Sequence, residues 1–113
     1  MSSCVIYSGK MTVNNYMDDE NLYIVFPNGL GDDKLASVLG TWTENAAGTE
    51  NAPLTMVNYT CRYITSTEFF IIKEDEYYRL DVKIASDSEI EVTMLNEDDV
   101  VVSTGWSALT LLT

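Results

Sequence analysis

Hydrophobic and polar residues alternate most regularly in the second half of the chain. In YYRLDVKIA, residues 77–85, apolar side chains at every second position share one face and polar side chains share the other. EIEVTML, residues 89–95, repeats this pattern. A period of two is typical of an antiparallel strand with one buried face.

The segments around these two strands are rich in β-branched and aromatic residues, which favour strands. They are EFFIIK before them and VVVSTGW and ALTLLT after them. The linkers KEDE, ASDS and NEDD are short, so consecutive strands are expected to pair as hairpins. We therefore predict a meander of four or five strands from Glu68 to Thr113.

The first half of the chain is less regular. SCVIYS and KMTVNNY predict two strands on either side of Gly9, and NLYIVF predicts a third. TWTEN and APLTMVNYTCRYIT predict two further strands, the second of them long. Eight or so short strands in one chain are typical of a small barrel or a sandwich.

DDKLASVLG, residues 32–40, follows a helical spacing instead. Leu35, Val38 and Leu39 fall on one helical face, an aspartate precedes them as a candidate cap, and Gly40 follows as a candidate end. We predict one short helix here.

The fold class predicted from these patterns is mainly β, a small antiparallel meander that closes into a barrel or a two-layer sandwich, with one short helix. The length of 113 residues indicates a single β domain over 1–113. Small polar residues, Gly48 and Pro53 predict a mobile loop over about 43–53. This loop is either an insertion without consequence, which we favour, or a recognition element.

Charge changes the picture more than any motif. Six Lys and Arg against 18 Asp and Glu give a net charge of -12. Such a surface repels nucleic-acid phosphates and anionic membranes and attracts basic partners. We expect no direct nucleic-acid binding and no membrane binding, but a basic protein partner, such as a nuclease or another nucleic-acid-binding effector.

Candidate catalytic chemistry is sparse. The chain has no His, which removes Ser-His-Asp and Cys-His arrangements, so we predict that it is not an enzyme. The two cysteines, Cys4 and Cys61, are consistent with buried free thiols or with one disulfide. Acidic runs offer oxygen ligands, but none matches a calcium loop, and we expect no metal site and no cofactor. The N-terminus does not look like a signal peptide, so a cytoplasmic location is expected.

ASVLGTWTEN, residues 36–45, resembles the start of a lipocalin-like barrel, in which a helical turn leads into a Gly-x-Trp strand. The resemblance implies an up-and-down barrel that carries a small apolar ligand, with Trp42 near its closed end. The alternative is that Trp42 and Trp106 only pack in the core or at its edge, and we favour this alternative.

The acids gather at the predicted turns. In a meander, successive turns alternate between the two ends of the sheet, so KEDE and NEDD share one end and SDSE lies at the other. Solvated turns explain part of this, since Asp is favoured there. They do not explain why so few Lys or Arg lie beside these acids in the sequence. The predicted partner-binding residues are Glu74, Asp75, Glu76, Glu97, Asp98 and Asp99, with Tyr77 and Trp106 adding apolar contact.

The expected function is that of a non-catalytic acidic binding or inhibitor protein. Its negative surface would engage a basic site, one that normally holds nucleic acid, on a partner protein. In size, charge and missing catalytic residues the chain is similar to the acidic inhibitors that phages encode against nucleases or CRISPR effectors, and to immunity proteins. If phage-encoded, it would act in the host cytosol. The alternative is a lipocalin-like carrier of a small apolar ligand.

Overall fold

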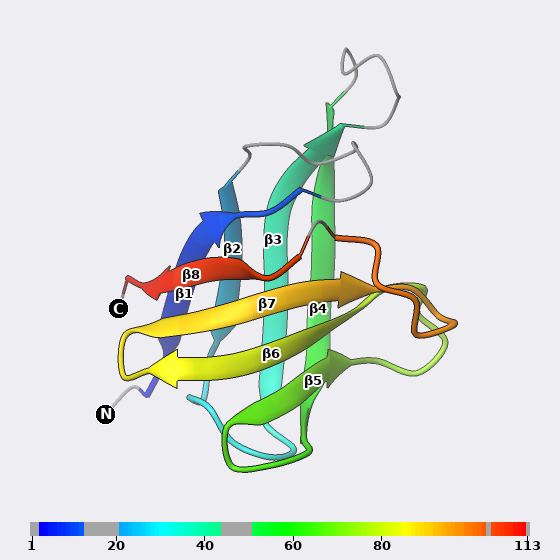
Figure 1. Ribbon diagram of the computed structural model, residues 1–113. Helices are drawn as coiled ribbons and strands as arrows, with labels where there is room; N and C mark the ends of the chain where they lie inside the picture. Colours follow the sequence, from blue (N-terminus) through cyan, green and yellow to red (C-terminus); the bar gives the residue numbers. More distant parts are fainter. Residues whose placement is uncertain (1–2, 13–20, 44–50, 104, 113) are drawn as a thin grey trace.

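The computed structural model describes residues 3–12, 21–43, 51–103 and 105–112 (Figure 1). Eight antiparallel strands follow one another in sequence order around a closed barrel. This confirms the mainly β prediction and selects the barrel over the sandwich. The strands are β1 Val5–Lys10, β2 Asn21–Phe26, β3 Leu35–Thr43, β4 Asn51–Tyr63, β5 Glu68–Ile72, β6 Arg79–Ser86, β7 Glu89–Leu95 and β8 Ser107–Leu111.

The barrel closes between its first and last strands, β1 and β8. Gly9 pairs with Leu109 in this seam, and a Cβ atom on Gly9 would lie 2.5 Å from the carbonyl oxygen of Ala108. Glycine is therefore needed because two backbones approach closely here. The predicted break into two strands at Gly9 is wrong, since β1 runs through it.

The predicted helix over 32–40 is also wrong, because β3 occupies most of this segment. Ala36 and Val38 are fully buried in the barrel, whereas Leu35 and Leu39 are 38% and 41% exposed. The apolar residues thus serve two faces of a strand rather than one face of a helix. The backbone N–H and C=O groups of β3 pair with β2 on one side and with β4 on the other. This pairing outweighs the local helical spacing of the apolar residues.

The long strand predicted from APLTMVNYTCRYIT is β4, and a bulge divides it. The register with β3 shifts next to Asn58, which has a φ of 59°, and its N–H bonds the Ser37 hydroxyl. Met56 and Tyr59 therefore both face the interior although they are three positions apart.

The predicted loop over 43–53 is too long, because β3 and β4 include its ends, and residues 44–50 lie outside the described part.

The strand predicted from VVVSTGW does not form as a whole. Leu95 and Val101 make an isolated bridge, and the N–H of Val102 bonds the carbonyl of Met94 at 2.8 Å. Regular pairing resumes only in β8. The β7–β8 connection therefore begins with the predicted tight turn over residues 96–99, but the strand expected directly after this turn is reduced to a single bridge.

Apolar side chains fill the barrel from all eight strands. The rings of Tyr7 and Phe26, and of Phe26 and Phe69, meet edge to face at 5.9 and 6.0 Å. Tyr63 stacks on Phe69 at 4.7 Å. This contiguous core explains why a domain of this size needs no disulfide, and neither Cys4 nor Cys61 forms one.

The two thiols are expected to differ in reactivity. Cys61 is fully buried, and its burial, together with nearby Asp32, raises the pKa of its thiol to about 11. Cys4 is only partly buried. A disulfide reagent at pH 7 should therefore modify Cys4 in the native protein and Cys61 only after unfolding. The Cys4→Ser variant leaves Cys61 as the one thiol of the chain, so its rate of modification can be compared with that of the natural chain. Equal rates of modification for the two thiols in the native protein would contradict this packing.

Candidate functional site

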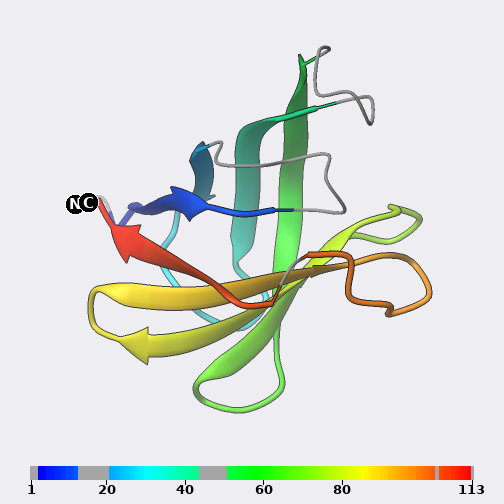
Figure 2. The same ribbon diagram turned by 45° about the horizontal axis from the view of Figure 1, so that its top comes forward.

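The two acidic turns singled out in the sequence lie at the same end of the barrel. Because the strands run up and down in sequence order, the β5–β6 and β7–β8 connections share one end. Figures 1 and 2 both show these connections on the same side of the molecule. We use "acidic rim" for the six carboxylates that these two connections carry: Glu74, Asp75, Glu76, Glu97, Asp98 and Asp99.

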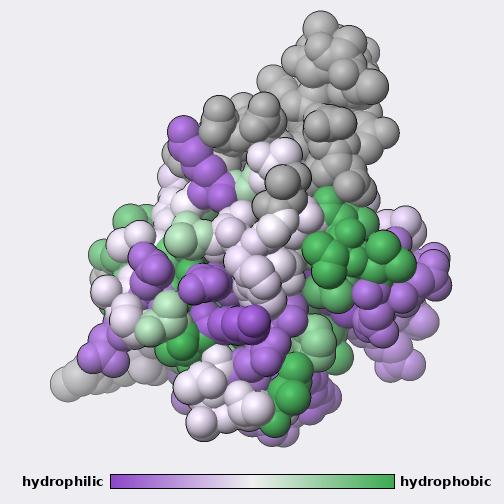
Figure 3. Space-filling view, viewed as in Figure 1, coloured by the Kyte–Doolittle hydropathy of each residue, from purple (hydrophilic) through white to green (hydrophobic). Residues whose placement is uncertain are grey.

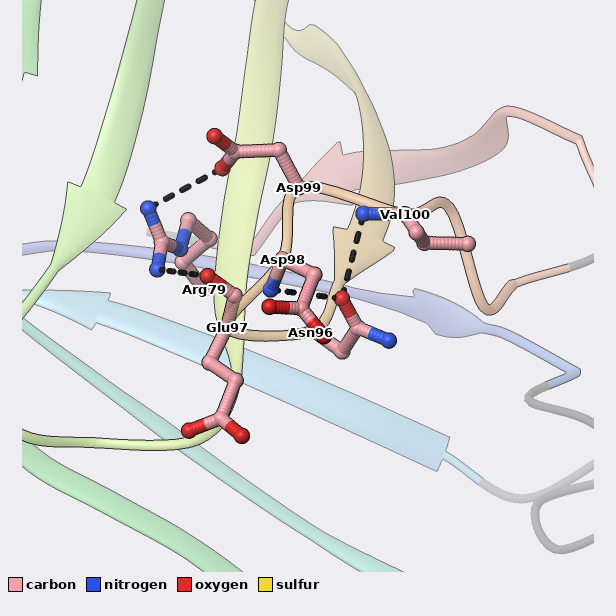
Figure 4. Close-up of polar contacts among 6 residues, drawn as sticks. All are labelled: Arg79, Asn96, Glu97, Asp98, Asp99 and Val100. Atoms are coloured by element: carbon pink, nitrogen blue, oxygen red, sulfur yellow. Dashed lines mark hydrogen bonds and ion pairs between the residues drawn. The ribbon is translucent and has the colours of Figure 1, made fainter.

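The 97–99 triplet sits on a turn that Asn96 organises (Figure 4). The Asn96 side-chain oxygen accepts hydrogen bonds from the N–H groups of Asp98 at 2.8 Å and Val100 at 3.1 Å. The Asn96 carbonyl accepts one from the N–H of Asp99 at 3.0 Å. Asp99 has a φ of 61°, a conformation that Asp and Asn tolerate better than most residues. The turn is therefore well defined, and all three carboxylates of the triplet belong to exposed residues.

Arg79, at the start of β6, anchors this turn to the barrel. Its guanidinium lies 3.0 Å from an Asp99 carboxylate oxygen and donates a hydrogen bond to the Glu97 carbonyl at 3.2 Å (Figure 4). The pattern of residues in the sequence did not predict this contact. The β6–β7 register contains the signal, because Arg79 pairs with Leu95, directly before the turn.

Replacing Arg79 by Met should lower the free energy of unfolding by about 1 kcal/mol, since a partly desolvated ion pair and a hydrogen bond are lost. Arg62→Met provides a matched control. Arg62 pairs with Asp33, but its side chain is 55% exposed against 28% for Arg79. Urea denaturation should show the smaller loss for Arg62→Met, and the reverse order would contradict the anchoring role.

The other triplet lies on a tight turn after β5. The N–H of Glu76 bonds the carbonyl of Lys73 at 3.3 Å, and Asp75 has a φ of 65°. Burial, and then the neighbouring Glu76 carboxylate, raise the pKa of Tyr59 to about 12. The turn borders a hollow of about 480 Å³ on the barrel wall. The hollow is lined by Thr60, Arg62, Ile72, Lys73, Glu74, Asp75, Glu76 and Arg79.

The two predicted aromatic contact residues occupy different settings. Tyr77 follows the 74–76 triplet, is 49% exposed, and meets Tyr78 edge to face at 4.6 Å. Trp106 is 39% exposed, and the Lys83 ammonium lies over its ring, 4.0 Å from the centroid. Tyr77 thus lies on the acidic rim, whereas one face of Trp106 is already occupied by a lysine from the wall of the barrel.

Apolar surface adjoins the acidic rim. Val100 and Val101 follow the 97–99 triplet and are 54% and 53% exposed. Figure 3 shows hydrophobic surface next to strongly hydrophilic surface on the side of the β7–β8 connection. Apolar groups beside charges are a common composition of protein contact surfaces. Their β-branched side chains predicted a strand, so these valines were not among the predicted contact residues.

A separate pair of carboxyl groups lies on the outer wall of the barrel. Glu68 on β5 pairs with Lys83 on β6, and Asp81 is two positions from that lysine. Burial, followed by a hydrogen bond with Glu68 and its charge, raises the pKa of Asp81 to about 6, although Lys83 opposes the shift. One buried Asp81 oxygen has no hydrogen-bond partner among the described residues.

Asp81 therefore makes stability depend on pH. Since the folded state holds this proton more tightly than the unfolded state, the contribution is full below about pH 4 and is lost as the pH rises through about 6. Asp81→Asn should raise the free energy of unfolding at pH 7 by about 1 kcal/mol after allowance for solvent screening, and by less at pH 4. Urea denaturation at both pH values tests this, with Asp87→Asn as the exposed control. An equal gain at both pH values would contradict it.

The acidic run at Asp32 and Asp33 does not join the acidic rim. Asp32 and Asp33 lie in the β2–β3 connection at the opposite end, where Asp33 pairs with Arg62. The run at 18–20 lies outside the described residues. In the part of the chain that the structure describes, no three His, Cys, Asp or Glu residues are grouped so as to hold a metal ion. The same part contains no helix of the length and apolarity needed to cross a bilayer.

No protein-family model, no curated protein and no solved structure matches this chain.

Proposed function

We propose that this chain is a non-catalytic acidic binding protein whose acidic rim engages a basic site on a partner protein. The observation that carries the proposal is the gathering of six carboxylates on two connections at one end of the barrel. Within the described residues, Asp99 is the only one of the six in an ion pair. Glu76 shares a hydrogen bond with the Tyr59 side chain. Glu74, Asp75, Glu97 and Asp98 are exposed and face solvent, where cations of a partner can reach them.

Self-repulsion gives this arrangement its functional weight. Clustered carboxylates destabilise a fold unless cations are interspersed. Arg62, Lys73 and Arg79 line the hollow beside the 74–76 triplet and offset part of this repulsion, but they are half of all the Lys and Arg in a chain with a net charge of -12. The local backbone demands Asp or Asn only at the two positions with positive φ, Asp75 and Asp99. Turn conformation therefore does not account for the acids at the other four positions.

The partner class follows from charge. Clusters of Arg and Lys that hold nucleic-acid phosphates form extended basic surfaces on proteins. We propose that the rim occupies such a surface, as in an inhibitor of a nuclease or CRISPR effector or in an immunity protein, in the cytosol of the cell that holds the target. Tyr77, Val100 and Val101 would add apolar contact around the charges.

A capture experiment tests this proposal. The immobilised protein is exposed to cell lysate at low salt, and duplex DNA is then added as a competitor. Bound proteins should be basic nucleic-acid-binding proteins that either DNA or higher salt releases. A bound set that neither treatment releases would contradict the proposal.

The alternative, a carrier of a small apolar ligand, shares the closed barrel with the proposal. The packed interior of the barrel is less favourable to the binding of such a ligand. Phe26, Phe69 and Ile71 are fully buried in one contiguous apolar cluster. Trp42 lies on the third strand, after β1 and β2, and the helical turn of the lipocalin-like pattern is replaced by β3.

A further inference from the structure

One edge of β4 extends beyond its neighbour. Its register with β5 runs from Thr60 to Tyr63, whereas its register with β3 runs from Asn51 to Thr60. In the described part of the chain, residues 51–56 therefore have a partner strand on the β3 side only, and Val57 lies in the bulge, outside both registers. Figure 1 shows this part of β4 above the end of β5.

The free side of β4 carries backbone hydrogen-bonding groups. The Val57 carbonyl points to it, because it accepts a hydrogen bond at 3.3 Å from the ammonium of Lys73, which directly follows β5. Alternate residues of a strand direct their backbone groups to the same side, so the N–H and C=O of Thr55 and the C=O of Pro53 do likewise. Pro53 has no N–H, which suits an edge position. No strand of the described chain pairs with these groups.

The surroundings of this edge restrict what can pair with it. The Lys73 side chain covers one carbonyl, and the bulge at Asn58 twists the strand, two devices that limit unwanted strand pairing. A second copy of this chain would bring another net charge of -12 against the first. The turn that carries Glu74, Asp75 and Glu76 begins where β5 ends, in line with any strand added beside β4. Arg62 and Arg79, which line the adjoining hollow, are each paired with an aspartate outside the 74–76 triplet. Lys73 alone among the lining cations is then set against three carboxylates, so the charge of the site favours a basic occupant.

We propose that the free edge of β4 is a docking site for an extended basic segment of the partner protein, which adds to the sheet as a strand beside residues 53–57. This inference rests on the proposed function, which sets the charge of the occupant. Backbone hydrogen bonds to Thr55 and Val57 hold the segment, and its basic side chains lie beside the 74–76 carboxylates. Because side chains alternate along a strand, the fitting sequence alternates basic and β-branched residues.

Peptide binding tests the inference. The probe is a short peptide in which Val and Lys alternate, added to the isotope-labelled full chain at low salt. A second peptide of the same sequence is N-methylated at two adjacent central residues, which keeps its charge and blocks strand pairing on both edges. The unmodified peptide should slow amide exchange at Thr55 and Val57 and bind about tenfold more tightly than the methylated one.

The outcomes separate the two proposals. Equal binding of both peptides, with spectral changes confined to the acidic rim, overturns the docking edge and leaves the proposed function in place. No binding of either peptide at low salt overturns both. Slow exchange at Thr55 and Val57 that grows with protein concentration, without peptide, assigns the edge to a second copy and also overturns the inference.

A variant of the chain adds an independent test. Lys73→Gln uncovers the Val57 carbonyl and removes a positive charge, so it should tighten binding of the unmodified peptide several-fold. Lys83→Gln makes the same change of charge beside Trp106. An equal effect of the two variants would show that charge alone acts, and would contradict the role of the edge.

Discussion

Replacing all six carboxylates of the acidic rim by their amides should weaken binding to a basic partner about 100-fold at low ionic strength. Each screened contact contributes about 0.5 kcal/mol, and six together about 3 kcal/mol, which corresponds to this factor. The amides keep the shape of the side chains, and Asn tolerates the positive φ at positions 75 and 99. Titration calorimetry with the captured partner measures the change.

A matched control separates the acidic rim from net charge. One triple variant neutralises Glu97, Asp98 and Asp99, and another neutralises Asp32, Asp87 and Glu89, which belong to the opposite end of the barrel. Both change the net charge by the same amount. Only the first should weaken binding strongly, and a similar loss in both would show that the overall field acts without a defined site.

Truncating Phe69 to Ala should lower the free energy of unfolding by about 3 to 5 kcal/mol. Phe69 is fully buried, and its ring contacts both Phe26 and Tyr63. The loss combines the transfer free energy of the ring with the cost of the cavity that remains. Urea denaturation measures it, provided that the slope of the transition is unchanged.

Phe70→Ala is the control, because the neighbouring residue on β5 faces outward and is only partly buried. It should cost clearly less than Phe69→Ala. A small effect of Phe69→Ala would mean that the interior is loosely packed, and the carrier alternative would then gain support over the binding protein.

The fold could be predicted best where one face of a strand is buried and the other is polar. The alternation in β6 and in the first half of β7 satisfied this condition, although Val92–Leu95 at the end of β7 are all buried. It failed in β3, where Leu35 and Leu39 are exposed and mimic a helical stripe. The secondary structure of such a segment is determined by pairing with two neighbouring strands, which cannot be predicted from the local spacing of its residues.

The acidic rim followed from the alternation of turns in a meander, which requires only the order of the strands. The contact of Arg79 with the 97–99 turn did not, because it depends on the register between β6 and β7. The free edge of β4 depends on the unequal lengths of β4 and β5, which residue patterns at strand ends do not define. Tertiary pairing therefore determines the details of the site.

The most direct test of the central claim is the dependence of partner affinity on salt. The dissociation constant of the complex with the captured partner is measured from low to physiological ionic strength, for the natural chain and for the variant with all six rim carboxylates neutralised. We expect the affinity of the natural chain to fall by about tenfold or more over this range, and that of the variant to change little. An affinity of the natural chain that is independent of salt would contradict the proposal that its acidic rim binds a basic partner.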